Sequence, residues 1–344
     1  MRLPARLALC AAITFAPQAS RADEGGVSMW VPGFYGSLAA TPMQPGFSFA
    51  SILYSDHLAA DREVARARQI TIGRFNPVVD INVAARLHAP PELLIAIPQY
   101  TFATPVLGGQ ATLLAVQGFG YNRVSIDATI EATIGPFSLT RSEHLFDSRY
   151  GFSDLGLQGN LRWNRGVHNF MTYGYVNVPT GTYDSTRLAN FGIGHWAVDA
   201  GGGYTYFNPE TGHEFSGVLG FTYNFENPST QYKNGIDMHF DWGASKFLSK
   251  QVFVGLVGYA YQQLTCDSGA GDRVGCFESR VFGIGPQLGY IFPIGTTHQG
   301  YLNVKGYKEF EAENRPEGWN VWLTLAIAPA AEPPPPAHTP MFRK

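Results

Sequence analysis

Positive charge is scarce in this 344-residue chain, where Lys and Arg number 24 against 27 Asp and Glu. Phosphate contacts need clustered Lys and Arg, and a chain with a formal net charge of −3 and six Lys argues against a nucleic-acid partner. After the first twenty positions, no run of apolar residues reaches the 18 or more that a membrane-spanning helix needs. Three sequence signatures of enzymes are also missing: Gly-x-Ser-x-Gly, His-Glu-x-x-His, and a phosphate-binding glycine loop between a strand and a helix. The sequence therefore predicts no catalytic residue, no cofactor and no metal site.

The first 22 residues have the pattern of an export signal. Arg2 and Arg6 form the positive end, Leu7–Phe15 is a short apolar run, and small residues precede a cleavage point after Ala22. Lipidation of Cys10 is the alternative, although Leu9 is bulkier than the residue that normally precedes a lipidated cysteine. We expect residues 1–22 to be removed on export.

Only two cysteines follow this leader, Cys266 and Cys276. In an oxidising compartment, two cysteines this close together and separated by Asp, Gly and Ser predict a loop-closing disulfide. Two free thiols are the alternative.

Alternation of apolar and polar residues dominates from about residue 78 to residue 328. The clearest segment places Phe215, Leu219 and Phe221 on one face and Ser216 and Thr222 on the other. Such segments run for about ten to fourteen residues, which is the length that a tilted strand needs to cross a bilayer and is longer than most strands of a soluble sandwich. Aromatic residues also gather near the segment ends, as in the interfacial girdles of membrane barrels. The pattern predicts an all-β protein, a transmembrane antiparallel outer-membrane β-barrel.

Twelve strand segments can be counted along residues 45–329. Pro90 with Pro91 could split the second segment, and Tyr121 with Asn122 the third, which would give fourteen. The continuous apolar register from Leu114 to Ile134 favours twelve. Short links alternate with longer ones near 135–152, 181–194, 227–234 and 265–277, so the short links are expected on the periplasmic side and the long ones outside.

The two ends of the exported chain lack strand character. Residues 23–44 are rich in glycine and aromatics, and we expect them to fold inward as a plug or to lie in the periplasm. Residues 330–344 contain four consecutive prolines and are expected to form a disordered tail.

Polar residues opposite the apolar parity are predicted to line the lumen. Asp237, His239 and Asp241 alternate with apolar residues on one strand, about 7 Å apart, so they cannot converge on one metal ion. Together with ten others they form the predicted substrate or lumen-lining set: Arg123, Asp127, Glu131, Gln158, Arg162, Asn224, Asp237, His239, Asp241, Gln287, Tyr301, Lys305 and Tyr307.

Several motifs resemble those of the outer-membrane family of meta-pathway phenol-degradation proteins. They occur in the same order over about residues 24–328, and they include Phe152-Ser-Asp-Leu-Gly156, Val178-Pro-Thr-Gly-Thr-Tyr-Asp184, Asn208-Pro-Glu-Thr-Gly-His-Glu-Phe-Ser216 and Gly283-Ile-Gly-Pro286. The resemblance implies a porin-like barrel linked to uptake of aromatic or other hydrophobic small molecules. The proline tail after the last strand departs from the common ending of such barrels on an aromatic residue.

These observations predict an outer-membrane channel for passive uptake of small aromatic or hydrophobic compounds linked to phenol-type catabolism. Its partners would be outer-membrane lipid and the solute; no oligomeric state is predicted. The alternative is a structural or adhesive outer-membrane barrel without transport. A lumen wide enough for solute favours transport, whereas a lumen packed shut favours the structural role.

Overall fold

The structure is a computed structural model that describes residues 28–60, 81–89, 92–134, 137–272, 275–276 and 278–330. In these residues the regular secondary structure consists of β-strands: β1 (Gly46–Ala60), β2 (Ile81–Ala89), β3 (Glu92–Thr101), β4 (Gln110–Ile134), β5 (Phe137–Phe152), β6 (Leu155–Arg165), β7 (His168–Val178), β8 (Ala197–Asn208), β9 (His213–Asn224), β10 (Asp237–Phe247), β11 (Val252–Gln263), β12 (Arg280–Ile294), β13 (His298–Glu313) and β14 (Glu317–Pro329). Within the described ranges, no helix is long and apolar enough to cross a membrane.

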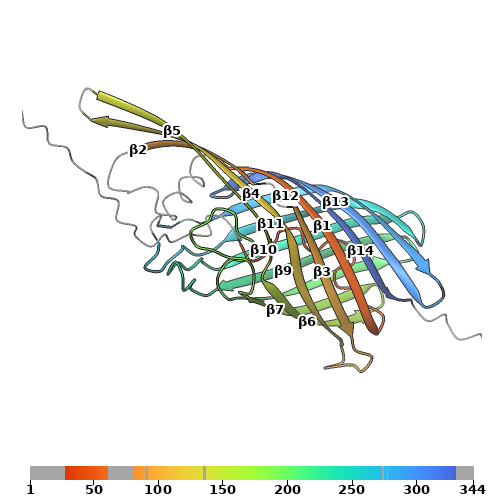
Figure 1. The fold of residues 1–344 in the computed structure, drawn as a ribbon. Helices are drawn as coiled ribbons and strands as arrows, with labels where there is room; N and C mark the ends of the chain where they lie inside the picture. The colour runs from red at the N-terminus through yellow and green to blue at the C-terminus, as the bar shows by residue number, and fades with distance from the viewer. Residues whose placement is uncertain are drawn as a thin grey trace, which may run out of the picture.

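The strands form one antiparallel barrel (Figure 1). Each strand from β6 to β14 pairs with the next, and β14 returns to β1 in a register that runs from Phe49 opposite Ile327 to Ala59 opposite Glu317. This pairing closes the wall. The barrel has twelve positions around its circumference, as predicted, because two of the positions are each shared by two strands.

The first shared position lies between β1 and β4. Strand β3 pairs with the first part of both neighbours, and β2 pairs with their continuation. The expected second segment is therefore interrupted between Ala89 and Glu92, and Pro90 and Pro91 themselves lie outside the described residues. Strand β4 runs unbroken through Tyr121 and Asn122, in line with the prediction that this segment is not split.

The second shared position corrects the prediction of a long link over residues 135–152. Residues 137–152 form β5, which pairs with β4 from Phe119 opposite Phe152 to Ile134 opposite Phe137, and β6 then pairs with the beginning of β4. In Figure 1 the β4–β5 hairpin and β2 extend beyond the rest of the barrel. The sequence of β5 has little alternation, because Arg141, Glu143, His144 and Asp147 fall on both parities, and this is why the segment was predicted as a link.

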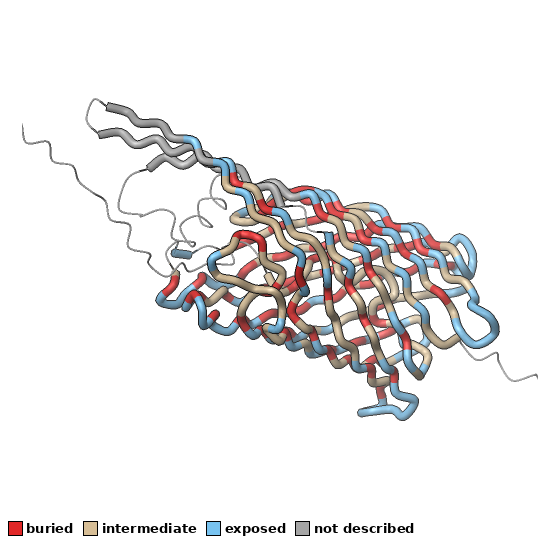
Figure 2. The backbone as a smooth tube through the Cα atoms, viewed as in Figure 1, coloured by how far each residue is buried: buried red, intermediate tan, exposed pale blue. Residues whose placement is uncertain are grey.

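Burial alternates along the strands, as Figure 2 shows. In β9, Glu214, Ser216, Thr222 and Asn224 are buried, while Phe215, Leu219 and Phe221 are more than 40% exposed on the outer surface. Polar side chains therefore face inward and apolar side chains face outward, which is the reverse of a soluble protein and the pattern of a barrel in lipid.

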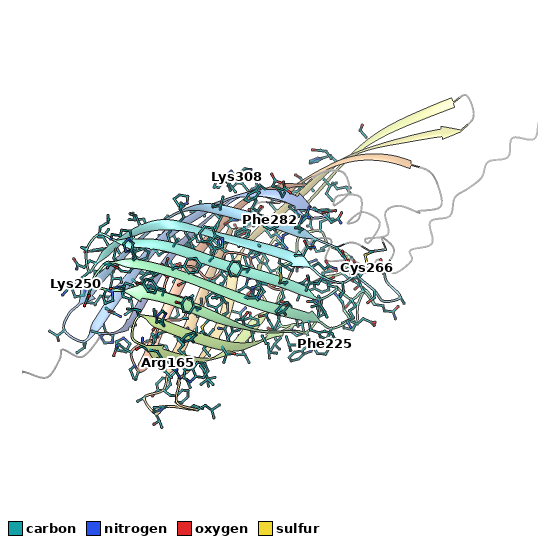
Figure 3. All side chains as sticks on the ribbon, turned by 180° about the vertical axis from the view of Figure 1, so that it is seen from behind. Arg165, Phe225, Lys250, Cys266, Phe282 and Lys308 are labelled. Carbon is teal, nitrogen blue, oxygen red and sulfur yellow. A yellow bond between two sulfur atoms is a disulfide. The ribbon has the colours of Figure 1, made fainter. Side chains whose placement is uncertain are left out.

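The two ends of the barrel differ. At one end short turns join β6 to β7 and β10 to β11, near Arg165 and Lys250; we call it the turn end (Figure 3). At the other end, near Phe225 and Cys266, longer segments join β7 to β8, β9 to β10 and β11 to β12; we call it the loop end. The leader of residues 1–22 lies outside the described residues, as does the expected tail from residue 331 onward.

Candidate functional site

A stretch of chain without regular strand structure occupies the interior of the barrel. These residues, 28–45, precede β1 and are called the inner segment. The segment begins near the loop end, where the Ser28 hydroxyl accepts a hydrogen bond from Arg315, and it ends at the turn end, where β1 begins. Along this path its residues contact successive inward-facing side chains of β10, from His239 to Ser245.

Two buried residues of opposite charge hold one turn of the inner segment. The Asp241 carboxylate accepts hydrogen bonds from the backbone N–H groups of Gly33 (2.9 Å) and Tyr35 (3.2 Å). From β13, three strands away along the wall, the Lys305 ammonium donates to the carbonyl oxygens of Gly33, Phe34 (3.0 Å) and Tyr35 (3.2 Å). All three ammonium protons are thereby engaged, and we call this arrangement the backbone clamp.

Gly33 is the residue that lets the chain enter the clamp. Its φ of +88° is in the left-handed region, where side chains with a Cβ are disfavoured. A Cβ atom at this position would also lie 2.9 Å from two ring carbons of Tyr307, whose hydroxyl donates to the Gly33 carbonyl (3.2 Å). The turn therefore depends on glycine for both backbone conformation and space.

An aromatic contact fixes the inner segment nearer the loop end. The Trp30 indole stacks on the His239 ring with centroids 3.7 Å apart and 13° between the planes. His239 Nε2 lies 3.1 Å from Asp199, which also accepts hydrogen bonds from Tyr173 (2.7 Å) and Thr222 (2.6 Å). The Asp199 carboxylate is thus the centre of a buried polar network on which Trp30 rests.

Hydrogen bonds to side chains of three further strands anchor the half of the inner segment nearer the turn end. The N–H groups of Leu38, Ala40 and Met43 donate to side-chain oxygens of wall residues on three strands, at 2.9, 3.0 and 2.7 Å. The Ser37 hydroxyl lies 2.8 Å from that of Ser245 and accepts from Gln287 (2.7 Å). Side chains of the wall therefore bind the segment along its whole length through noncovalent contacts.

A cavity of about 200 Å³ remains between the inner segment and the wall. It is lined on one side by residues 34–37 and Ala39 of the segment. On the other side it is lined by residues of β1, β3, β12, β13 and β14, including Ile52, Ile97, Tyr301 and Thr324.

The structure brings most of the predicted lumen residues into this interior. Ten of the thirteen lie on inward-facing positions around the inner segment: Gln158, Arg162, Asn224, Asp237, His239, Asp241, Gln287, Tyr301, Lys305 and Tyr307. Gln158 donates to the Tyr35 hydroxyl (2.8 Å) and Asn224 to Asp237 (2.9 Å). Arg162 makes one hydrogen bond within the described part of the chain, a long one of 3.4 Å to Thr112.

The placement of Arg123 and Asp127 is corrected by the structure. Even-numbered side chains of β4 face inward, since Val124 and Ile126 are buried, so both charged residues lie on outward-facing positions and are exposed. Asp127 contacts His144 of β5 at 2.6 Å. The side chain of Glu131 lies outside the described residues.

The physical reason for this inversion is an apolar region on the inner face of the barrel. Leu114 and Val116 of β4 pack against a buried cluster that includes Ile52, Ile97 and Trp322. An apolar side chain of β4 therefore does not mark the lipid-facing side, because the interior of the barrel is itself apolar there.

Sequence reasoning missed several residues that hold the inner segment. Asp199 lies on β8, where Gly201, Gly202 and Gly203 obscure the alternation. Glu214 and Thr205 lie on inward positions of recognisable strands, so parity alone could have found them. No signal in the sequence could have paired them with backbone N–H groups of residues 38 and 40.

The predicted disulfide between Cys266 and Cys276 is confirmed, with an S–S distance of 2.04 Å. It closes the loop after β11 at the loop end (Figure 3). Within the described residues, a single group of His, Cys, Asp or Glu side chains places three ligand atoms together, namely these two sulfurs with Glu278, and the disulfide already occupies both sulfurs.

Comparison with known proteins identifies the family of this chain. The family model described as "Putative MetA-pathway of phenol degradation" matches residues 87–325. The chain belongs to this family. No curated protein sequence matches the chain.

Two solved structures are similar to the chain. An outer membrane channel from Pseudomonas putida F1 is similar at a TM-score of 0.61 and 12% identity, covering 85% of this chain and 98% of that one. A FadL homologue from Pseudomonas aeruginosa is similar at a TM-score of 0.43 and 9% identity, covering 90% and 96%. At this level of identity the first likeness concerns the barrel fold.

Proposed function

We propose that this protein is an outer-membrane channel that admits small aromatic or hydrophobic compounds without energy input. Its membership of a family named for phenol degradation supports this role, as does the likeness to an outer membrane channel. The outward band of exposed apolar residues, such as Leu219, Leu256 and Leu288, fits a wall in contact with lipid.

The proposal includes an orientation. The turn end would face the periplasm and the loop end, with its disulfide, the outside, because short turns are periplasmic in such barrels. Residues 1–22 would direct export, and cleavage after Ala22 would leave Asp23 as the first residue. The inner segment would then run from the outer mouth to the periplasmic rim.

One observation carries the proposal: the barrel is wider than its own wall side chains can fill. Small barrels of eight strands are filled by side chains, whereas this wall of twelve positions encloses a separate length of chain and still leaves a cavity beside it. Inward-facing Gln158, Asp241 and Lys305 bind that chain through hydrogen bonds that can exchange for water or solute. A solute would pass beside the inner segment or after part of it has shifted.

The alternative of a structural or adhesive barrel rests on the same segment, because contacts along its whole length could hold the interior permanently closed. Influx separates the two functions. Labelled phenol, benzoate and a long-chain fatty acid would be supplied to intact cells with and without the gene. We expect faster influx of the aromatic compounds in cells that carry the gene. Equal rates for all three solutes with and without the gene would contradict transport and leave the structural function.

A deletion gives a sharper version of this experiment. Removing residues 28–43 keeps all strands of the barrel, and we expect it to raise both solute influx and ion conductance in planar bilayers. Folding of the shortened barrel would be checked by its heat-modifiable migration. A folded deletion variant with unchanged conductance would mean that the inner segment does not limit passage.

A further inference from the structure

The cavity beside the inner segment has a lining of two chemical kinds. Phe34, Ile52, Ile97 and Ala39 give it apolar surface. Polar atoms approach it from β13 and β14, where Tyr301, Asn303 and Thr324 line the same space. An apolar site with a few polar groups is the usual composition of a small-molecule site.

Three polar groups of this lining, on Tyr301, Asn303 and Thr324, are available to a ligand. Within the described part of the chain, the hydroxyls of Tyr301 and Thr324 have no hydrogen-bond partner. Asn303 donates through its amide nitrogen to the Leu288 carbonyl (3.1 Å), which leaves its side-chain oxygen as a free acceptor. Hydroxyls can accept or donate, so the cavity offers hydrogen bonds of both senses.

The one positive charge at the cavity is not available. Lys305 lines the space, but its three ammonium protons point to the three carbonyls of the backbone clamp. A carboxylate entering the cavity would lose its hydration without gaining a free cation, which is strongly unfavourable. The cavity therefore suits an uncharged molecule that carries a hydrogen-bonding group.

Size restricts the ligand further. A cavity of about 150 Å³ in another protein holds one benzene ring. The space here, about 200 Å³, suits one substituted ring and is too small for a long acyl chain.

We propose that this cavity is a binding site for a single neutral one-ring aromatic compound with a hydroxyl or similar donor group. The ring lies between Phe34 and the pair Ile52 and Ile97, and the donor reaches Asn303, Tyr301 or Thr324. This inference rests on the proposed function, because it treats the bound ring as a solute on its way through the barrel. A ring in this cavity would lie between the two ends of the interior. Five of the twelve lining residues belong to the inner segment, so the segment completes the site as well as filling the barrel.

Binding is measured on the purified full chain in detergent, by fluorine NMR with two probes of nearly equal size. At pH 7 the probe 4-fluorophenol is neutral, whereas 4-fluorobenzoate is a carboxylate. We expect saturable binding of 4-fluorophenol, competed by unlabelled phenol, and binding of 4-fluorobenzoate at least tenfold weaker.

Two changes at one position separate space from hydrogen bonding. Thr324→Phe fills the cavity and should abolish saturable binding. Thr324→Val keeps the shape of the cavity and removes one hydroxyl, and Tyr301→Phe in a separate variant does the same. Each variant should bind about three- to tenfold more weakly, the usual effect of one lost hydrogen bond. The matched control is Tyr290→Phe on the outer surface of β12, where the side chain is 41% exposed; it should bind like the unaltered protein.

Equal affinity for the two probes would overturn the proposal, as would unchanged binding in folded Thr324→Phe protein. If Thr324→Phe does not fold, Thr324→Val and Tyr301→Phe decide in its place, and the proposal fails if both bind like the Tyr290→Phe control. These measurements need no membrane and no gradient. Selective binding without any effect of the gene on influx would refute transport and keep the site, whereas influx that Thr324→Phe leaves unchanged would refute the site and keep transport.

Discussion

The backbone clamp makes a prediction about how firmly the inner segment is held. Lys305→Met removes the ammonium that binds three consecutive carbonyls, and it removes the favourable interaction of that charge with the buried Asp241 carboxylate. Hydrogen bonds to charged groups contribute about 1.5 to 3 kcal/mol each and do not add fully, so local release of the segment should become easier by roughly 2 to 4 kcal/mol. The barrel wall should stay intact, because the strand pairing does not involve the clamp.

The assay uses a cysteine placed in the inner segment. Ala39→Cys provides one reactive thiol, since the two cysteines after the leader are joined in a disulfide. Labelling by a bulky maleimide requires the segment to leave its place, so the rate follows the population of the released state. At a factor of ten per 1.4 kcal/mol, Lys305→Met should raise the rate roughly 30- to 1000-fold.

Lys308→Met is the matched control. This lysine lies on the same strand, faces outward, and makes a 3.3 Å hydrogen bond to the Gly318 carbonyl. The variant should label at the rate of the Ala39→Cys protein alone. Should Lys305→Met and Lys308→Met label equally fast, the clamp would contribute nothing to holding the segment, and our account of the interior would be refuted.

Three further predictions concern the wall and the loop end. Leu219→Arg should lower the free energy of unfolding in lipid by about 2 to 4 kcal/mol, whereas Leu248→Arg, in a turn, should lower it by about 0 to 1 kcal/mol. Urea titrations of both variants measure these changes. Similar changes in the two variants would place Leu219 away from the bilayer midplane. Burial raises the pKa of Asp267 to about 6, so its contribution to loop stability is greatest below the unfolded value near 4 and is lost as pH rises through 6. Hydrogen exchange in the loop after β11, corrected for intrinsic rates, should therefore increase from pH 5 to pH 7, and Asp267→Asn should remove that increase. Replacing Cys266 and Cys276 with serine should destabilise the same loop by about 2 to 3 kcal/mol and raise protease nicking there without changing heat-modifiable migration; failure to assemble would show that the barrel needs the disulfide.

Alternation predicted the wall of the barrel because lipid and interior impose different chemistry on neighbouring residues. Strands such as β9, with Phe215 and Leu219 outside and Ser216 and Thr222 inside, leave little choice of register. The same rule failed on β4, because Leu114 and Val116 meet an apolar cluster inside the barrel. It also missed β5, because Arg141, Glu143, His144 and Asp147 interrupt the apolar parity of that segment.

The contacts of the inner segment could not be predicted, since most of them use backbone groups. The N–H and C=O groups of Gly33 and Tyr35 are the same in any sequence, and only the folded chain shows that Asp241 and Lys305 bind them. Those two residues could be assigned to the interior from parity. Their partners, up to 272 positions away, could not.

The order of the chain has a consequence for assembly of the barrel. The inner segment is synthesised before any strand, yet its hydrogen-bonding partners on the wall lie on β4, β6, β8, β9, β10, β12 and β13, so these contacts must wait for the later strands. Contacts that close such long loops form late, because their entropic cost is met only after nearer pairings exist. Closure of β1 onto β14 needs none of them. In a newly closed barrel the interior would therefore be empty for a time, and the barrel would be permeable to small solutes. The time that the inner segment takes to bind inside would determine how long each new molecule makes the membrane permeable.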